Sequence, residues 1–170
     1  MAAWTQAETG ILSNRNLALA TAALLAVMLV AMARGAAEFP RLPVLVQAHL
    51  LAMVAIMAIT VPMLLQPKGT TRHRLLGRSW AALMFGNALL TLCFNAGSSA
   101  PGGVFAGDIS PIHAISLFVL VMVPVAVLRA RRHDVRGHEG TIRGLVIGSL
   151  LVAGFFTLPF GRTMGTWLLG

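Results

Sequence analysis

The sequence predicts an all-α membrane protein with five transmembrane helices, of which the last four form a four-helix bundle. Hydrophobic residues make up 57% of its 170 residues and charged residues only 11%, and the mean hydropathy is +0.82. A soluble domain contains roughly 25% charged residues, so this chain cannot cover its surface with polar groups. Its net charge of +8 comes from Lys and Arg residues between apolar runs, a pattern typical of a chain threaded through a bilayer and not of a nucleic-acid-binding protein.

Five apolar segments approach the roughly 20 residues that a helix needs to cross about 30 Å of hydrocarbon. They are Leu17–Ala33, Val44–Leu65, Trp80–Phe94, Pro111–Leu128 and Ile142–Phe160. The third segment is the shortest, and it must borrow residues from the preceding sequence RHRLLGRS to span the membrane. We therefore expect an N-terminal tail and an extra transmembrane helix in residues 1–41, and the four-helix bundle in residues 42–170.

Local signals mark where these segments begin and end. The first segment is also compatible with a cleaved secretory signal, because it contains Arg15, an apolar run and the sequence AMARGAA. The length of the apolar run nevertheless favours an uncleaved helix. Pro43 precedes the second segment and Pro67 ends it, because proline is tolerated only in the first turn of a helix. Ser110 and Pro111 are an N-cap followed by a proline at the first helical position.

The distribution of Lys and Arg predicts the orientation in the membrane. Ten of these residues fall on one side of the predicted spans: Arg15, Lys68, Arg72, Arg74, Arg78, Arg129, Arg131, Arg132, Arg136 and Arg143. Only Arg34, Arg41 and Arg162 fall on the other side. Because basic residues are enriched in cytoplasmic loops, the N-terminus is expected in the cytoplasm and the C-terminus outside it.

Residue types that are absent from the spans narrow the function. All five acidic residues lie outside the predicted spans, which argues against a transporter coupled to protons or sodium ions, since such proteins use carboxylates inside the membrane. Cys93 is the only cysteine, so no disulfide framework is possible within the chain.

Four of the five histidines occupy related positions near helix ends. His49 and His113 lie near the outer ends of the second and fourth segments, and His73 and His138 open the third and fifth at the inner side. The two steps are 24 and 25 residues, and an arginine follows each inner histidine five residues later. Residues 49–78 and 113–143 therefore look like two copies of one helix–loop–helix unit. We call His49 and His113 the outer pair, and His73 and His138 the inner pair.

Paired histidines at a common depth suggest a haem protein. Two facing neutral imidazoles can ligate one haem iron and leave it suited to electron transfer. Glycines at positions 77, 86, 140, 144 and 148 would leave room for a flat cofactor, and Arg74, Arg78 and Arg143 could pair with its propionates at the inner site. Each feature also has a simpler interpretation. The histidines can lie in the headgroup layer, the glycines can pack helices, and the arginines can bind lipid phosphate.

Three stretches resemble a large group of bacterial predicted membrane proteins of unknown function. They are HLLAMVAIMAITVPMLLQPKGTTRHRLLGRSW, PIHAISLFVLVM and GHEGTIRGLVIGSLLVAGFFTLPFGR, and the resemblance covers residues 42–170. Its marks are His49, the segment His73-Arg74-x-x-Gly77-Arg78, His113 and His138. The chain departs from the group at Glu139 and Gly140, where a basic pair is common, and at Pro159-Phe160-Gly161-Arg162, which interrupts a Pro-Gly-Arg. The resemblance implies a location in the bacterial inner (plasma) membrane.

The plan of four helices and four histidines is also similar to that of the di-haem cytochromes b, although those proteins place both ligands of a helix within one span. We therefore expect a b-type haem protein that transfers electrons to a redox partner, with His49, His113, His73 and His138 as iron ligands. The outer pair is the stronger expectation, because both of its members lie inside their spans. The alternative is a non-catalytic accessory protein without a cofactor, which packs against a larger membrane complex or lipid. Whether the protein is an enzyme stays open.

Overall fold

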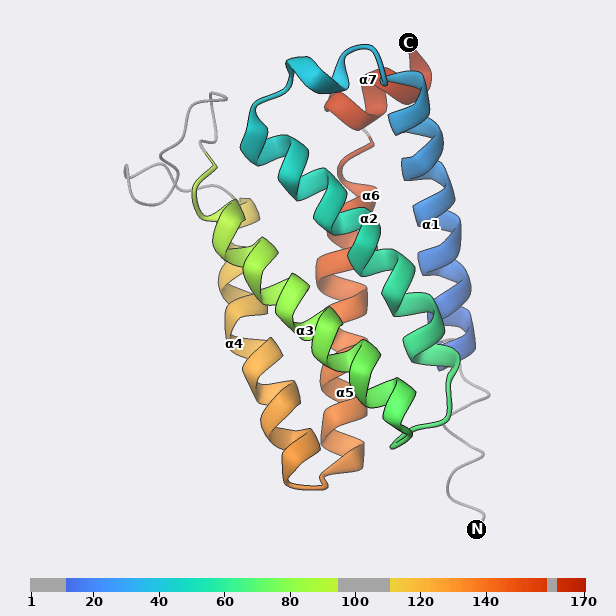
Figure 1. Cartoon of the computed structure of the whole chain (residues 1–170), viewed down its shortest axis with the longest axis vertical. Coiled ribbons are helices and arrows are strands. Elements are labelled where there is room, and N and C mark those ends of the chain that lie inside the picture. The colour runs from blue at the N-terminus through green and yellow to red at the C-terminus, as the bar shows by residue number, and fades with distance from the viewer. Residues whose placement is uncertain (1–11, 95–110, 159–161) are drawn as a thin grey trace.

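The computed structural model describes residues 12–94, 111–158 and 162–170, and within these ranges it is a bundle of long helices (Figure 1). The long helices are α1 (Asn14–Arg34), α2 (Val44–Leu65), α3 (Thr71–Thr91), α4 (Pro111–Arg131) and α5 (Val135–Leu145). Helix α5 continues directly into the π-helix η4 (Val146–Val152) and then into α6 (Ala153–Phe155). Two short helices complete the described chain, η2 (Phe39–Arg41) and α7 (Thr163–Leu169). The predicted all-α fold class is confirmed.

Three helices are long and apolar enough to cross a membrane, namely α1, α2 and α4. The five predicted spans are therefore supported only in part. Helix α3 has the length of a span, but Arg72, His73, Arg74 and Arg78 occupy its first two turns. The predicted fifth span, Ile142–Phe160, begins near the end of the polar helix α5 and continues through the π-helix η4 and α6. Its last two residues lie outside the described chain.

Short polar side chains cap α1, α3 and α5, because they accept hydrogen bonds from backbone N–H groups that have no partner within the helix. Ser13 accepts a hydrogen bond from the Asn16 N–H at the start of α1. Thr70 accepts one from the His73 N–H at the start of α3, at 3.1 Å. The turn between α2 and α3 contains Gly69 at a φ of 77°, a backbone conformation that glycine adopts without steric cost.

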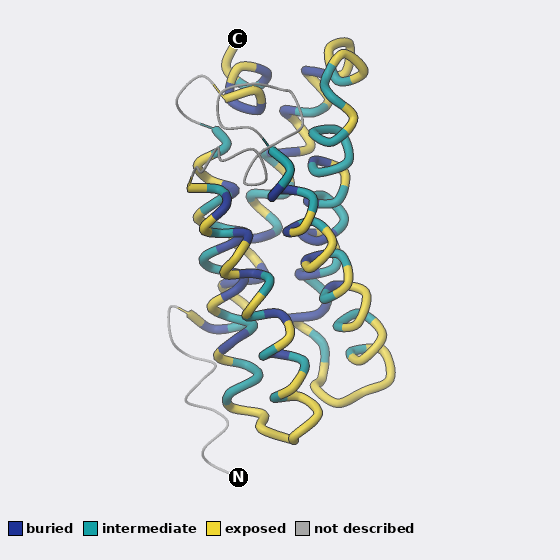
Figure 2. The backbone as a smooth tube through the Cα atoms, turned by 90° about the vertical axis from the view of Figure 1, so that its left-hand side faces the viewer, coloured by how far each residue is buried: buried dark blue, intermediate teal, exposed yellow. Residues whose placement is uncertain are grey.

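Each long helix packs against the next in the sequence, and α1 also packs against η4, which closes the bundle. Ala18, Thr21 and Ala31 of α1 are fully buried, so the first helix packs closely against the helices that follow it. Buried positions alternate with exposed ones along every long helix (Figure 2). At mid-depth the Trp80 Nε1–H donates to Thr60 Oγ1 at 2.8 Å, which links α3 to α2.

The two ends of the bundle differ in charge. Helices α1, α3 and α5 begin, and α2 and α4 end, at the lower end in Figure 1. The ten basic residues that the sequence assigned to one side all belong to the helix ends and turns found there, and we call it the basic end. At the opposite end α7, which the sequence analysis did not predict, packs on α1. The Trp167 Nε1–H donates to Glu38 Oε2 at 3.0 Å, and the indole ring lies against Gly35.

Candidate ligand cavity at the basic end

A cavity of about 520 Å³ opens among α2, α3, α4 and α5 at the basic end. Its volume lies in the range of sites for small molecules and cofactors, about 300 to 1,000 Å³. Its floor is apolar and includes Met63, Leu64, Trp80, Val123, Val127 and Ile142. Its polar lining includes Asn14, Lys68, His73, Arg74, Arg78, Arg131, His133, His138 and Glu139. With one acidic and four Lys or Arg side chains, the lining favours an anionic ligand with an apolar body.

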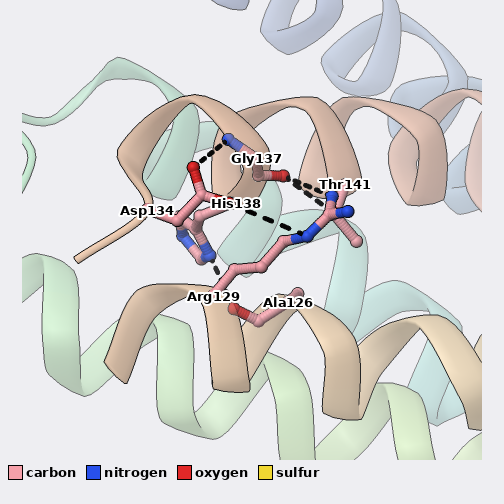
Figure 3. Close-up of polar contacts among 6 residues, drawn as sticks. All are labelled: Ala126, Arg129, Asp134, Gly137, His138 and Thr141. Atoms are coloured by element: carbon pink, nitrogen blue, oxygen red, sulfur yellow. Dashed lines mark hydrogen bonds and ion pairs between the residues drawn. The ribbon is translucent and has the colours of Figure 1, made fainter. Parts of the chain in front are cut away.

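Both histidines of the inner pair line this cavity. The His138 Nδ1 lies 2.9 Å from the Ala126 carbonyl oxygen of α4 (Figure 3). A carbonyl can only accept, so Nδ1 carries the proton of the neutral ring and Nε2 keeps a lone pair. A histidine that ligates a metal commonly makes this kind of hydrogen bond, because it fixes the tautomer and the orientation of the ring.

The turn between α4 and α5 holds His138 in this position (Figure 3). Asp134 caps α5 by accepting the Gly137 N–H at 3.0 Å. Arg129 donates from Nη1 to the Gly137 carbonyl at 3.0 Å and to Thr141 Oγ1 at 2.6 Å. A Cβ atom at position 137 would lie 2.0 Å from Asp134 Oδ2, so only glycine fits the capped turn as it stands.

His73 has a buried ring nitrogen that is available to bind a ligand. Its Nδ1 is buried and has no hydrogen-bond partner among the described residues. Such buried polar atoms are rare in folded proteins and call for an explanation. His73 lies two turns before the apolar part of α3, and its pKa is lowered. Burial is the main cause and the neighbouring Lys68 and His138 add to it, while a backbone hydrogen bond with Met63 opposes it. The lowered pKa favours the neutral ring, the form that ligates metals.

The three arginines expected around the inner site are divided by the structure. Arg74 and Arg78 line the cavity. Arg143 instead donates from Nη2 to Glu139 Oε1 at 3.0 Å and from Nε to Asn14 Oδ1 at 3.1 Å. Asn14 in turn donates to Glu139 Oε1 at 2.8 Å. This network forms one wall of the cavity and joins the start of α1 to α5.

Both histidines of the outer pair contact Phe94, at the end of the bundle opposite the basic end. The His49 Nδ1 lies 3.0 Å from Asn87 Oδ1, and its ring meets the Phe94 ring edge to face with the centroids 5.4 Å apart. The His113 Nε2 lies 2.9 Å from the Phe94 carbonyl oxygen, and His113 is fully buried. Each of these imidazoles is thus hydrogen-bonded within the protein. Residues 95–110, which follow Phe94, lie outside the described chain.

Several interactions around the cavity were not predicted from the sequence. The Asp134–Gly137 cap has the three-residue spacing of an N-cap, and Glu139 and Arg143 have the four-residue spacing of a helical ion pair, so both were visible in the sequence. Asn14 was not, because its partner lies 125 residues away. Within residues 12–94, 111–158 and 162–170, no group of three or more His, Cys, Asp or Glu side chains is placed to hold a metal ion by itself.

Comparisons of the chain with families of known proteins, with curated proteins and with solved structures found no match.

Proposed function

We propose that the chain crosses the bacterial inner membrane five times, with its N-terminus in the cytoplasm and its C-terminus outside. In the bundle, α3 and the continuous helix from α5 to α6 run alongside the three apolar helices (Figure 1). Phe85 and Leu89 of α3 and Phe155 of α6 are exposed apolar side chains, as expected of surfaces that face lipid. The basic end supports the orientation, because cytoplasmic loops are rich in Lys and Arg.

Fusion reporters test this topology. A reporter fused after Gly170 is expected to be active outside the cytoplasm, and one inserted next to Arg136 is expected to be active inside it. If both read the opposite, the orientation is wrong. If both read the same side, the number of spans between the two sites is wrong.

We further propose that the protein binds b-type haem at the inner pair and transfers electrons. One observation carries this proposal: the buried, unpartnered Nδ1 of His73 belongs to a cavity that His138 also lines. His138 has its Nδ1 fixed by the Ala126 carbonyl, so that Nε2 is the nitrogen left for iron. Two neutral imidazoles are the ligand set that suits haem in electron transfer.

The rest of the lining fits the same group. Haem has an apolar macrocycle, which the floor around Trp80 and Val127 would contact, and two carboxylates, which Arg74 and Arg78 would bind near the water interface. When bound, haem supplies an iron that gains or loses one electron. The protein would orient the iron ligands, His138 through the hydrogen bond of its Nδ1 to the Ala126 carbonyl.

The structure shifts the preference between the two pairs. The outer pair, His49 and His113, stays a second proposed ligand pair, but Phe94 contacts both of its members. A flat group between those two rings would have to displace Phe94. The inner pair already shares a cavity, so we propose it as the principal site.

A non-catalytic accessory role is the second candidate. A Cβ atom added at Gly140 or Gly144 would meet nothing within 4 Å, so the exposed side of α5 has small residues without a neighbour among the described helices. Small residues let a partner helix approach closely in a membrane. In that case the inner arginines would serve only to anchor the bundle.

Absorption spectra of the purified protein, oxidised and then reduced with dithionite, separate these functions. Haem is expected to give bands that His73→Ala and His138→Ala each abolish. His133→Asn is the matched control, because His133 also lines the cavity, has no role as a ligand in the proposal, and has a φ of 58°, which Asn tolerates. A colourless wild-type protein after expression with added haem would overturn the haem proposal. Bands that survive both substitutions but vanish in His49→Ala would move the site to the outer pair.

A further inference from the structure

Four arginines at the basic end have no use in the cavity. Arg15 begins α1, Arg72 begins α3, Arg132 follows α4 and Arg136 begins α5, and all four are exposed. None of them lines the cavity, and no hydrogen bond or ion pair joins their guanidinium groups to another described residue. We call these four residues the arginine ring.

The acidic side chains described at this end cannot neutralise the ring. Asp134 caps the Gly137 N–H and lies 4.0 Å from Arg129. Glu139 is held by Asn14 and Arg143. Each carboxylate is thus engaged with groups outside the ring, which leaves a surface of uncompensated positive charge.

Apolar side chains accompany the charges. Leu12 is 56% exposed and precedes Arg15 by three residues, Leu75 is 64% exposed and follows Arg72 by three, and Val135 is 45% exposed beside Arg136. In helices, residues three or four apart lie on the same face. Leu75 and Arg72 therefore share a face of α3, and the exposed Leu12 and Val135 lie close in the chain to Arg15 and Arg136. Three of the four arginines thus have an exposed apolar residue nearby, a combination that matches a phospholipid headgroup and the start of its acyl chains.

From this surface we infer that the arginine ring binds the headgroups of anionic phospholipids, so that the protein selects such lipids around its basic end. The four charges are spread over the ends of four helices, as suits an annulus of lipid. Clusters of Lys and Arg next to the membrane surface attract anionic lipids by about fivefold in affinity for each basic residue. The inference does not depend on a haem in the cavity.

Spin-labelled lipids test this selectivity. The purified protein is reconstituted into phosphatidylcholine vesicles, and electron paramagnetic resonance measures the association of spin-labelled phosphatidylglycerol relative to spin-labelled phosphatidylcholine. We expect phosphatidylglycerol to associate about fivefold more strongly at low salt. The ratio should fall towards one in 1 M salt, where the Debye length is only about 3 Å.

The quadruple variant R15Q/R72Q/R132Q/R136Q is expected to lose this selectivity, and the matched variant with lysine at the same four positions is expected to keep it. Six basic residues remain at the basic end of the glutamine variant against three at the other, so its orientation is preserved, and a reporter after Gly170 verifies this.

A ratio near one for the wild type, or an unchanged ratio in the glutamine variant, overturns the inference. A third result would also overturn the inference: the wild type shows no lipid selectivity but binds polyglutamate, and the glutamine variant loses that binding. The ring would then serve an acidic protein partner. The haem bands should be the same in all three proteins, so loss of the haem proposal and loss of this inference are distinguishable.

Discussion

Whether Gly137→Ala raises or lowers the free energy of unfolding is expected to depend on Asp134. In the wild-type protein the new Cβ would lie 2.0 Å from Asp134 Oδ2, so the carboxylate must leave its position and the cap on the Gly137 N–H is lost. Loss of an N-cap costs about 1 kcal/mol, whereas replacing glycine by alanine in a helix gains about 0.5 kcal/mol. The net change is a destabilisation of about 0.5 kcal/mol. The exposed contact between Arg129 and Asp134 at 4.0 Å adds little, as surface ion pairs do.

In an Asp134→Ala background the steric conflict is absent, so the same Gly137→Ala change should stabilise the protein by about 0.5 kcal/mol. The two substitutions are thus coupled by about 1 kcal/mol, which a double-mutant cycle measures directly. The assay is unfolding of the purified proteins in mixed micelles with increasing SDS, followed by far-UV circular dichroism. If Gly137→Ala changes the free energy of unfolding equally in both backgrounds, the carboxylate does not cap α5 as described.

Three further changes test other parts of the structure. Thr60→Val leaves the buried Trp80 Nε1–H without its acceptor at 2.8 Å. This change should lower the free energy of unfolding by about 1 to 3 kcal/mol. When Trp80→Phe is then made in the Thr60→Val protein, the additional loss should be smaller than this. Gly35→Ala would place its Cβ 2.0 Å from the Trp167 ring, so we expect α7 to detach and trypsin to cleave after Arg162 faster than in the wild type. Because the pKa of His73 is lowered in the folded protein, the unfolded chain binds its proton more tightly. Stability should fall as the pH drops below about 6.5, and His73→Gln should reduce that fall.

The parts of the fold that were predictable are those that depend on local sequence. The bounds of α2 were predicted at both residues, because prolines flank a continuous apolar run. Helix α3 begins nine residues before the predicted apolar segment, since the Thr70 cap and good helix formers extend it through the charged residues. The π geometry of η4 and the short helix α7 have no strong local signal, because both depend on how the last part of the chain packs against α1.

The site was predictable only in part, for a similar reason. Spacing alone paired His73 with His138, and the structure places both at one cavity. The preference for the outer pair rested on depth in the membrane. That criterion could not reveal that Phe94 contacts both outer histidines, or that the buried Nδ1 of His73 is left without a hydrogen-bond partner among the described residues. Satisfaction of hydrogen bonds is a tertiary property, so it separates a ligand from a structural histidine only once the neighbours are placed.

The network of Asn14, Glu139 and Arg143 has a consequence for biosynthesis. Contacts between successive long helices can form as soon as each helical hairpin leaves the ribosome. The partner of Asn14 lies 125 residues later in the chain, so this contact can form only after α5 has been synthesised. The cavity, which Asn14 and Glu139 both line, is therefore complete only after that point. A ligand that needs the complete cavity would be acquired after the translation of α5, too late to guide the packing of the early helices.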